Sequence, residues 1–160
     1  MVRKSTLWLA VVAVSLIAAG CAAVAPAASA AQPTADPGQA IALPTAPAPA
    51  DSYRADSAAL VGATGRPQLI EFFAYWCTTC LAMRPTVHSL EATYWGKVEF
   101  VYLDIDNPDN SAMMQRYAFT AQPLFVLVAP DGTEIQRWFG YTQADEFTTA
   151  FDNYLAEHNG

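Results

Sequence analysis

The hydrophobic pattern of the second half of the chain predicts a series of buried strands. Short apolar runs bounded by glycine, proline or polar residues are typical of strands that are buried on both faces. Three such runs are present, at 68–74 (QLIEFFA), 98–103 (VEFVYL) and 124–129 (LFVLVA). A fourth strand is predicted at 134–139, because the preceding Asp131-Gly132 pair is typical of a hairpin turn.

Helices are predicted between and around these strands, where apolar residues recur at helical intervals. Their ranges are 77–94, 110–117 and 143–156, and a further short helix at 51–61 begins at a candidate N-cap, Asp51 or Ser52. This order of elements ends in a hairpin and a closing helix. It indicates an α/β fold of three layers, with a mixed central sheet and helices on both faces.

The N-terminal segment has the pattern of an export signal. Arg3 and Lys4 precede an uncharged apolar run at 7–19. The five residues that end at Cys21 (IAAGC) resemble a bacterial lipobox, in which the cysteine is lipidated and becomes the new N-terminus. We therefore expect residues 1–21 to be a lipoprotein-type export signal with Cys21 as the lipidation site.

Two other interpretations of this segment stay open. Ala28-Ser29-Ala30 is a cleavage site of the A-x-A type, which predicts release of a soluble protein. The uncharged stretch 7–25 is also long enough to remain as a membrane anchor. In each case Arg3 and Lys4 hold the N-terminus inside, so we expect the rest of the chain to lie outside the cytoplasm.

Residues 22–50 have the composition of a linker. The stretch contains 13 Ala and 6 Pro, and prolines at this density prevent a continuous helix and favour extended chain. We expect it to hold the folded domain, residues 51–160, away from a membrane surface. The alternative is a tail without this spacing role.

The charge balance narrows the choice of partners. The chain has 8 Lys and Arg against 15 Asp and Glu, and six basic residues remain once Arg3 and Lys4 are assigned to the signal. An acidic surface repels phosphate backbones, so we expect no nucleic acid among the partners. With 53% hydrophobic residues, the composition excludes a wholly disordered chain.

The chemistry is predicted at Cys77-Thr78-Thr79-Cys80, where a buried strand ends and a helix begins. A cysteine in the first turn of a helix faces unpaired backbone N–H groups and the positive end of the helix dipole, and both favour the thiolate. We therefore expect Cys77 to be the nucleophile. Cys80 follows on the same face of the helix, so we expect it to resolve a mixed disulfide.

Other roles for the two cysteines have less support. A zinc site needs more Cys or His ligands, and the remaining Cys21, His88 and His158 offer no second ligand pair, so we expect no metal site. We expect His88 to be a surface residue of the predicted helix. Haem attachment requires a histidine where Leu81 stands. A purely structural disulfide stays an alternative, although it stabilises little across so short a loop.

Several separated landmarks resemble thioredoxins in their order and spacing. They are the 71–80 segment (EFFAYWCTTC), Pro85, the 104–108 segment (DIDNP), Gln122-Pro123, and Asp131-Gly132 followed by Gly140. The resemblance covers about residues 60–155 and implies a thioredoxin-like fold. Within that superfamily, the chain is most similar to exported, membrane-tethered thiol:disulfide interchange proteins. This implies a redox-active Cys77–Cys80 disulfide and no further cofactor.

The resemblance also implies substrate-binding residues. Pro123 matches a cis-proline that faces the active disulfide and presents the backbone of Gln122 to an extended substrate. A trans-proline that starts an edge strand is the alternative. Gly140 matches a glycine that keeps the substrate groove open, although a glycine that ends the strand has the same appearance.

Two further residues match parts of the family's catalytic centre. Glu71 matches a buried acid beneath the second cysteine, where it accepts the proton of Cys80. The alternative is a side chain that reaches solvent or a local partner. Trp76 matches a tryptophan that shields the disulfide, and a core aromatic residue has the same appearance in the sequence.

We therefore expect a protein-disulfide reductase, with a role in cytochrome c maturation or in protein disulfide repair. Its implied partners are disulfide-containing proteins and a membrane thiol donor. Thr78-Thr79 replaces the Gly-Pro of typical thioredoxins, and this dipeptide influences the reduction potential. An oxidase or isomerase that runs the couple in reverse therefore stays open, as does a non-catalytic thioredoxin-fold binding module.

Overall fold

The predicted strands form one mixed sheet in the computed structural model, which describes residues 42–158. The strands are β1 (Gln68–Phe73), β2 (Glu99–Asp104), β3 (Leu124–Val128) and β4 (Glu134–Phe139), in the order β2-β1-β3-β4. β1 is parallel to β2 and antiparallel to β3, and β3 and β4 form the predicted hairpin. The four predicted strands are therefore confirmed within one residue of their ends.

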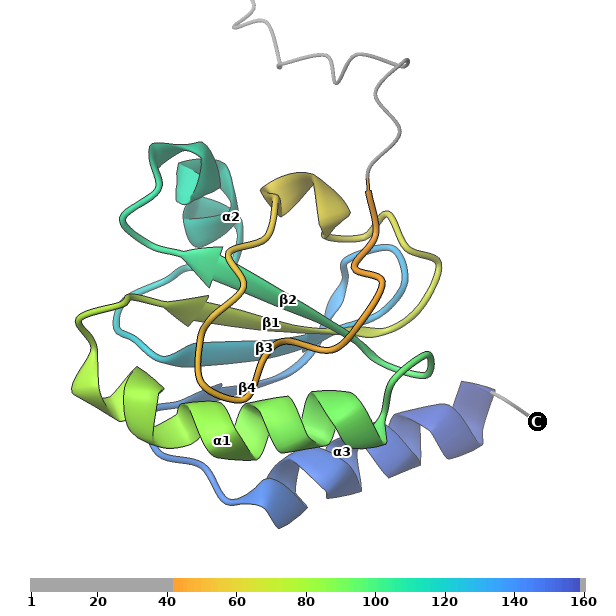
Figure 1. Cartoon of the computed structure of the whole chain (residues 1–160). Helices are drawn as coiled ribbons and strands as arrows, with labels where there is room; N and C mark the ends of the chain where they lie inside the picture. The colour runs from red at the N-terminus through yellow and green to blue at the C-terminus, as the bar shows by residue number, and fades with distance from the viewer. Residues whose placement is uncertain (1–41, 159–160) are drawn as a thin grey trace, which may run out of the picture. The chain divides into compact units, whose positions relative to one another are not determined.

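Helices cover both faces of this sheet. The α-helices are α1 (Thr78–Thr93), α2 (Ser111–Arg116) and α3 (Ala144–His158), and the short 3₁₀ helices are η1 (Ala58–Leu60) and η2 (Pro108–Asn110). α1 and α3 lie together on one face, and α2 and η1 lie on the other (Figure 1). The predicted α/β fold with three layers is confirmed.

Side chains of β1 point alternately to the two faces of the sheet, and this alternation determines which of them face α1. Leu69 and Phe73 belong to the apolar core on the α1 and α3 side, whereas Ile70 and Phe72 belong to the core on the α2 side. Because successive side chains of a strand point to opposite faces, Glu71 shares the α1 side with Leu69 and Phe73. A carboxyl group therefore stands within an otherwise apolar surface.

The predicted helix at 51–61 is wrong. Only η1 forms there, and residues 46–56 cross the domain without helical structure beside α1 and β2 (Figure 1). We call residues 46–56 the N-terminal strap. Its side chains reach separate partners: Tyr53 enters the core, and Arg54 donates to the Phe100 carbonyl at 3.0 Å. These contacts with distant residues outweigh the local preference for a helix.

The strap also covers the outer edge of β2. The Asp56 backbone N–H donates to the Tyr102 carbonyl at 2.8 Å, and the Tyr102 N–H donates to Asp56 Oδ2 at 3.0 Å. Within residues 42–158 no strand precedes β1. These contacts therefore satisfy some of the backbone N–H and C=O groups on the outer edge of β2, which a neighbouring strand would otherwise pair with.

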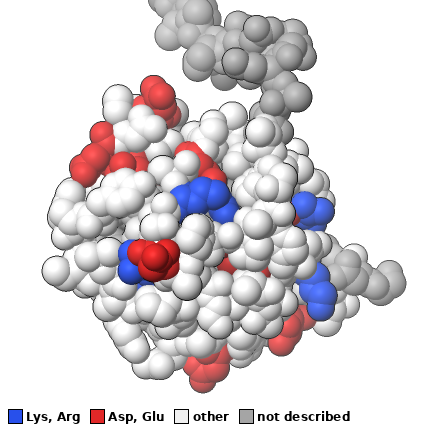
Figure 2. Space-filling view, in the orientation of Figure 1, with Lys and Arg blue, Asp and Glu red and all other residues white. Residues whose placement is uncertain are grey.

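Packing against the domain starts before residue 51. Ala48 is buried, and its N–H donates to Glu91 Oε2 at 2.9 Å. The predicted export signal, Cys21 and most of the predicted linker lie outside the described residues. None of the helices between 42 and 158 is both long and apolar enough to span a membrane. Charged side chains are scattered over the face drawn in Figure 2, most of which is uncharged.

Candidate active site

The two cysteines form a disulfide at the start of α1. Cys77 is the N-cap residue, Cys80 lies in the first turn, and their Cα atoms are 5.2 Å apart. The backbone N–H of Cys80 donates to Cys77 Sγ at 3.1 Å, so a helix N–H points at this sulfur as predicted. Cys77 is 6% exposed and Cys80 is 0% exposed. Only Cys77 therefore offers any surface to a partner.

Glu71 lies buried at the centre of β1, 1% exposed, so the alternative in which its side chain reaches solvent does not hold. Its Oε1 accepts a hydrogen bond from the Tyr53 hydroxyl at 3.0 Å, while its Oε2 has no hydrogen-bond partner among residues 42–158. Burial raises the pKa of Glu71 to about 8, and the Tyr53 hydrogen bond partly opposes this rise. Near neutral pH this carboxyl group can therefore either hold or give up a proton.

The Gln122–Pro123 peptide bond is cis, which is the geometry that the resemblance implied. Pro123 is buried just before β3, and Gln122 is half-buried. The Pro123 carbonyl accepts a hydrogen bond from the Gly140 N–H at 2.9 Å. Gly140 has a φ of +69°, and a Cβ at this position would meet no atom within 4 Å. Gly140 therefore adjoins the Pro123 turn, and its backbone conformation disfavours other residues.

Trp76 is an exposed residue rather than a core aromatic. Trp76 is 61% exposed, and its indole N–H donates to Asp106 Oδ2 at 2.6 Å. Tyr75, Phe139 and Tyr141 are also largely exposed. Trp76 precedes Cys77, and Phe139 and Tyr141 flank Gly140, so apolar surface adjoins both sequence segments of the candidate site.

A second buried acid, Glu91, was missed by the sequence interpretation. Its Oε2 accepts from the Ala48 N–H at 2.9 Å and from the Tyr102 hydroxyl at 2.7 Å, and its Oε1 accepts from Arg54 at 3.0 Å. The helical spacing of Cys80, Val87 and Glu91 places all three on one stripe of α1, and this spacing was a usable signal.

The prediction that His88 is a surface residue is wrong. His88 is buried beneath the strap, where its Nδ1 donates to the Pro49 carbonyl at 2.7 Å. Burial lowers the pKa of His88. The strap residues Tyr53 and Arg54 were also missed, because their partners lie far away along the chain. Among residues 42–158, no group of three or more His, Cys, Asp or Glu is arranged to hold a metal ion.

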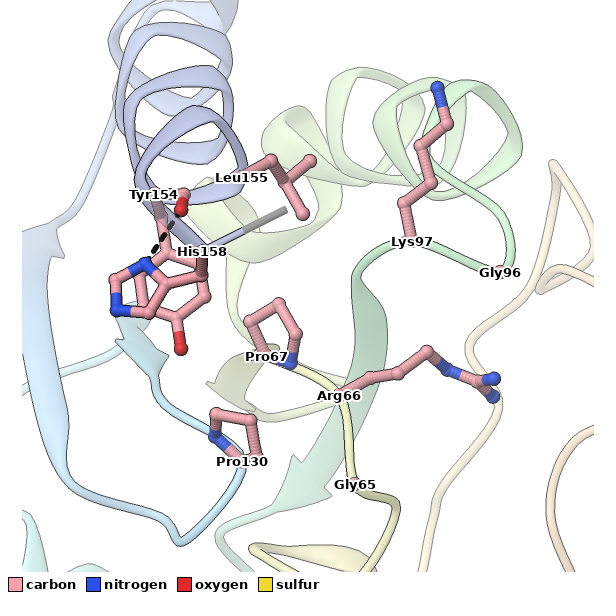
Figure 3. A pocket seen from close by; sticks show the side chains of 9 residues that line it. All are labelled: Gly65, Arg66, Pro67, Gly96, Lys97, Pro130, Tyr154, Leu155 and His158. Atoms are coloured by element: carbon pink, nitrogen blue, oxygen red, sulfur yellow. Dashed lines mark hydrogen bonds between the residues drawn. The ribbon is translucent and has the colours of Figure 1, made fainter. Parts of the chain in front are cut away.

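A surface hollow lies at the other end of the sheet. It is lined by Gly65, Arg66, Pro67, Gly96, Lys97, Pro130, Tyr154, Leu155 and His158 (Figure 3). Its walls include the residues that precede β1 and β2, whereas the disulfide follows the far end of β1. This hollow is therefore separate from the cysteine pair.

Comparison with known proteins agrees with this geometry. The Thioredoxin family profile matches residues 54–153. The chain is 38% identical to a thiol:disulfide interchange protein TxlA homolog from Synechocystis sp. over 91 residues. This aligned region makes up 57% of this chain and 51% of that protein. It is 30% identical to a thioredoxin from Staphylococcus aureus over 89 residues, and this aligned region makes up 55% of this chain and 82% of that protein. The chain thus spans about half the length of the first relative.

A solved structure has the same fold. A mutant thioredoxin from Halobacterium salinarum superposes with a TM-score of 0.51 at 26% identity, over 59% of this chain and 79% of that chain. The family profile spans more than half of the chain. The chain therefore belongs to the thioredoxin family.

Proposed function

We propose that this chain is a protein-disulfide reductase that acts outside the cytoplasm. The observation that carries the proposal is the asymmetry of the cysteine pair. Cys77 reaches the surface and accepts a helix N–H bond, whereas Cys80 is fully buried on the same side of the sheet as Glu71. A stabilised thiolate with a small accessible surface, next to a fully buried partner with a nearby acid, suits attack followed by resolution.

The proposed cycle starts from the reduced cysteine pair. The Cys77 thiolate attacks one sulfur of a substrate disulfide, which breaks the S–S bond and releases the other sulfur as a thiolate. Cys80 then gives its proton to the Glu71 carboxylate and attacks Cys77 Sγ. The Cys77–Cys80 bond forms, and the second substrate sulfur leaves as a thiolate. Both leaving thiolates take protons, so the substrate gains two electrons and the cysteine pair loses two.

Substrate binding is assigned to the surface beside Cys77. In this proposal Trp76 contacts the substrate, and the backbone of Gln122 and Pro123 pairs with an extended segment of it. Gly140 would leave this surface free of a side chain, since a Cβ there would stand in open space. Repeated turnover requires a dithiol donor, which we propose to be membrane-bound.

The proposed location follows from the N-terminal sequence. Arg3 and Lys4, the apolar run 7–19 and Cys21 support export and lipidation, with residues 22–50 as a spacer. A Cys21→Ser variant tests this: it should move from the membrane fraction to the soluble fraction and lose incorporation of labelled fatty acid. An unchanged distribution would contradict lipidation at Cys21.

Trapping of partners tests the activity. The full chain with Cys80→Ala should accumulate mixed disulfides with envelope proteins through Cys77, because the resolving thiol is absent. The matched Cys77→Ala variant should trap none. Equal capture by both variants, reversible without reductant, would instead indicate a binding module.

The reduction potential of the Cys77–Cys80 pair tests the direction. Equilibration with dithiothreitol or glutathione should give a value near the roughly −270 mV of thioredoxin. A value near the roughly −120 mV of a strong oxidase would overturn the reductase assignment and favour the reverse cycle.

A further inference from the structure

Tyr53 joins the two buried groups that the proposed cycle uses. Its hydroxyl oxygen lies 3.0 Å from Glu71 Oε1 and 2.7 Å from the backbone carbonyl oxygen of Cys80. Both are hydrogen-bond distances, but a phenol carries a single O–H hydrogen. The protonation state of Glu71 therefore decides which of the two acceptors receives that hydrogen.

Two arrangements fit this geometry. When Glu71 is a carboxylate, the Tyr53 hydroxyl donates to Oε1, and this bond to a charged acceptor stabilises the ionised form. When Glu71 is protonated on Oε1, the carboxyl O–H donates to the Tyr53 oxygen, and the phenol then donates to the Cys80 carbonyl. Tyr53 thus makes hydrogen bonds in both states, without any movement of the backbone.

The strap fixes the position of this hydroxyl. The Tyr53 ring is buried and stacks on Phe73, with ring centroids 4.0 Å apart and planes inclined by 18°. On one side of Tyr53 the strap is held through Ala48 and Glu91, and on the other side Arg54 donates to Phe100. A side chain held at both ends of its segment loses little further entropy when it bonds Glu71.

The surroundings of Glu71 contain few charges. The titratable or charged groups packed around Glu71 and Tyr53 are Cys80, Arg84 and His88 on α1, Tyr75 just before Cys77, and Tyr102 on β2. On β3 the residue opposite Glu71 is the apolar Phe125. Tyr53 donates the sole hydrogen bond to Glu71 within residues 42–158, so its removal acts directly on the ionised form.

We propose that Tyr53 is a positioning residue that holds Glu71 ready to accept the proton of Cys80. This inference rests on the proposed function and adds a member to its machinery. In the resolution step the Cys80 S–H bond breaks, the proton goes to Glu71, and the Cys80 sulfur bonds to Cys77 as the substrate thiolate leaves. Tyr53 exchanges no proton with solvent and forms no covalent bond. Its hydroxyl stabilises Glu71 before and after the transfer.

The test is a stopped-flow reaction of the reduced full chain with an aromatic disulfide that releases a coloured thiolate. The first equivalent of colour reports attack by Cys77, and the second reports resolution by Cys80. Tyr53→Phe should leave the first phase unchanged and slow the second about tenfold at pH 7. The midpoint of its pH profile should move up by about one pH unit, because loss of a hydrogen bond to a charged group disfavours the carboxylate.

Two comparisons separate this role from a structural one. Tyr117→Phe is the matched control, since Tyr117 is also buried and donates to a backbone carbonyl, that of Gly132, at 2.9 Å. It should leave both phases unchanged. In a Glu71→Gln background, Tyr53→Phe should have no further effect on the second phase, because the group that it serves has been removed.

The outcomes are distinguishable from failure of the proposed function. A missing first phase in the unsubstituted chain would overturn the reductase proposal together with this inference. Two normal phases with the same second-phase pH midpoint in Tyr53→Phe would overturn the inference alone. A tenfold slowing that persists in the Glu71→Gln background would also overturn it. The retained first phase verifies folding, since phenylalanine keeps the ring that stacks on Phe73.

Discussion

Glu71 and Glu91 are two buried carboxyl groups with opposite surroundings. Glu91 on α1 accepts hydrogen bonds from Ala48, Arg54 and Tyr102, so both of its oxygens have partners. Glu71 on β1 accepts one, from Tyr53, and its second oxygen has none in the described part of the chain. Burial alone therefore does not determine what a carboxyl group does.

The difference separates a structural acid from a reactive one. A buried carboxyl group that accepts from a cation and two neutral donors holds the groups around it in place. A buried carboxyl group with a single donor lies close to the balance between its two states, and the pKa of Glu71, raised by burial to about 8, reflects this. Glu91 should therefore govern stability and Glu71 should govern chemistry.

The largest expected effect is on the rate of resolution. Glu71→Gln should slow the second phase of the stopped-flow reaction about a hundredfold at pH 8, because the proton acceptor for Cys80 is lost. Glu91→Gln is the matched variant and should change this rate less than about twofold. If the two variants slowed the second phase equally, the assignment of Glu71 to chemistry and of Glu91 to stability would be wrong.

The second effect is on stability. Glu91→Gln should lower the free energy of unfolding by about 3 kcal/mol, since it leaves Arg54 without its charged partner on α1 and places amide hydrogens near other donors. Glu71→Gln should not lower it at pH 7, because Glu71 is mostly protonated in the folded chain, and glutamine is neutral and has a similar shape. Urea unfolding of the oxidised chains measures both values. A larger loss in Glu71→Gln would contradict the assignment.

A smaller loss is expected when one donor to Glu91 is removed. Tyr102→Phe should cost about 2 kcal/mol, because its hydroxyl donates to a buried carboxyl group that is paired with Arg54. Tyr117→Phe loses a bond to a neutral carbonyl and should cost about 1 kcal/mol. Equal losses, measured by urea unfolding, would contradict this difference between the two acceptors.

The most gradual effect is a change in the pH dependence of stability. The pKa of Glu71 is higher in the folded chain, at about 8, than the ordinary value of 4.5, so the folded state binds more protons between these pH values. Stability should therefore fall as pH rises through this window, by at most about 1.4 kcal/mol per pH unit. The lowered pKa of His88 acts in the opposite direction below its ordinary value, so the informative quantity is the difference between the unsubstituted chain and Glu71→Gln. Identical slopes would mean that Glu71 ionises as it does in the unfolded chain.

The centre of the domain could be predicted because its signals are local. The apolar run before Cys77, the two-residue spacer and the Asp131-Gly132 turn each determine structure within a few residues. Family resemblance added the positions of Glu71 and Pro123, which lie apart in the sequence from the cysteines. Their burial and the cis peptide are present in the structure, whereas their roles stay predictions.

The strap could not be predicted because its partners are distant. Tyr53 bonds residues 18 and 27 positions away, so its local sequence indicated a helix instead. The error about His88 has the same origin, since the strap carbonyl of Pro49 covers its ring. Glu91 was within reach, because helical spacing alone puts it on the buried stripe of α1.

The strap also affects whether the β2 edge of the sheet can pair with a strand of another molecule. In a parallel pair the N–H and C=O of alternate residues point away from the sheet, and such an unpaired edge accepts strands from other molecules. Here Asp56 forms hydrogen bonds with both the N–H and the C=O of Tyr102, and Arg54 donates to the carbonyl of Phe100. A charged side chain and an irregular backbone at this edge offer no template for a further strand. The same segment that orders the interior around Glu71 thereby disfavours pairing of a further strand at the β2 edge.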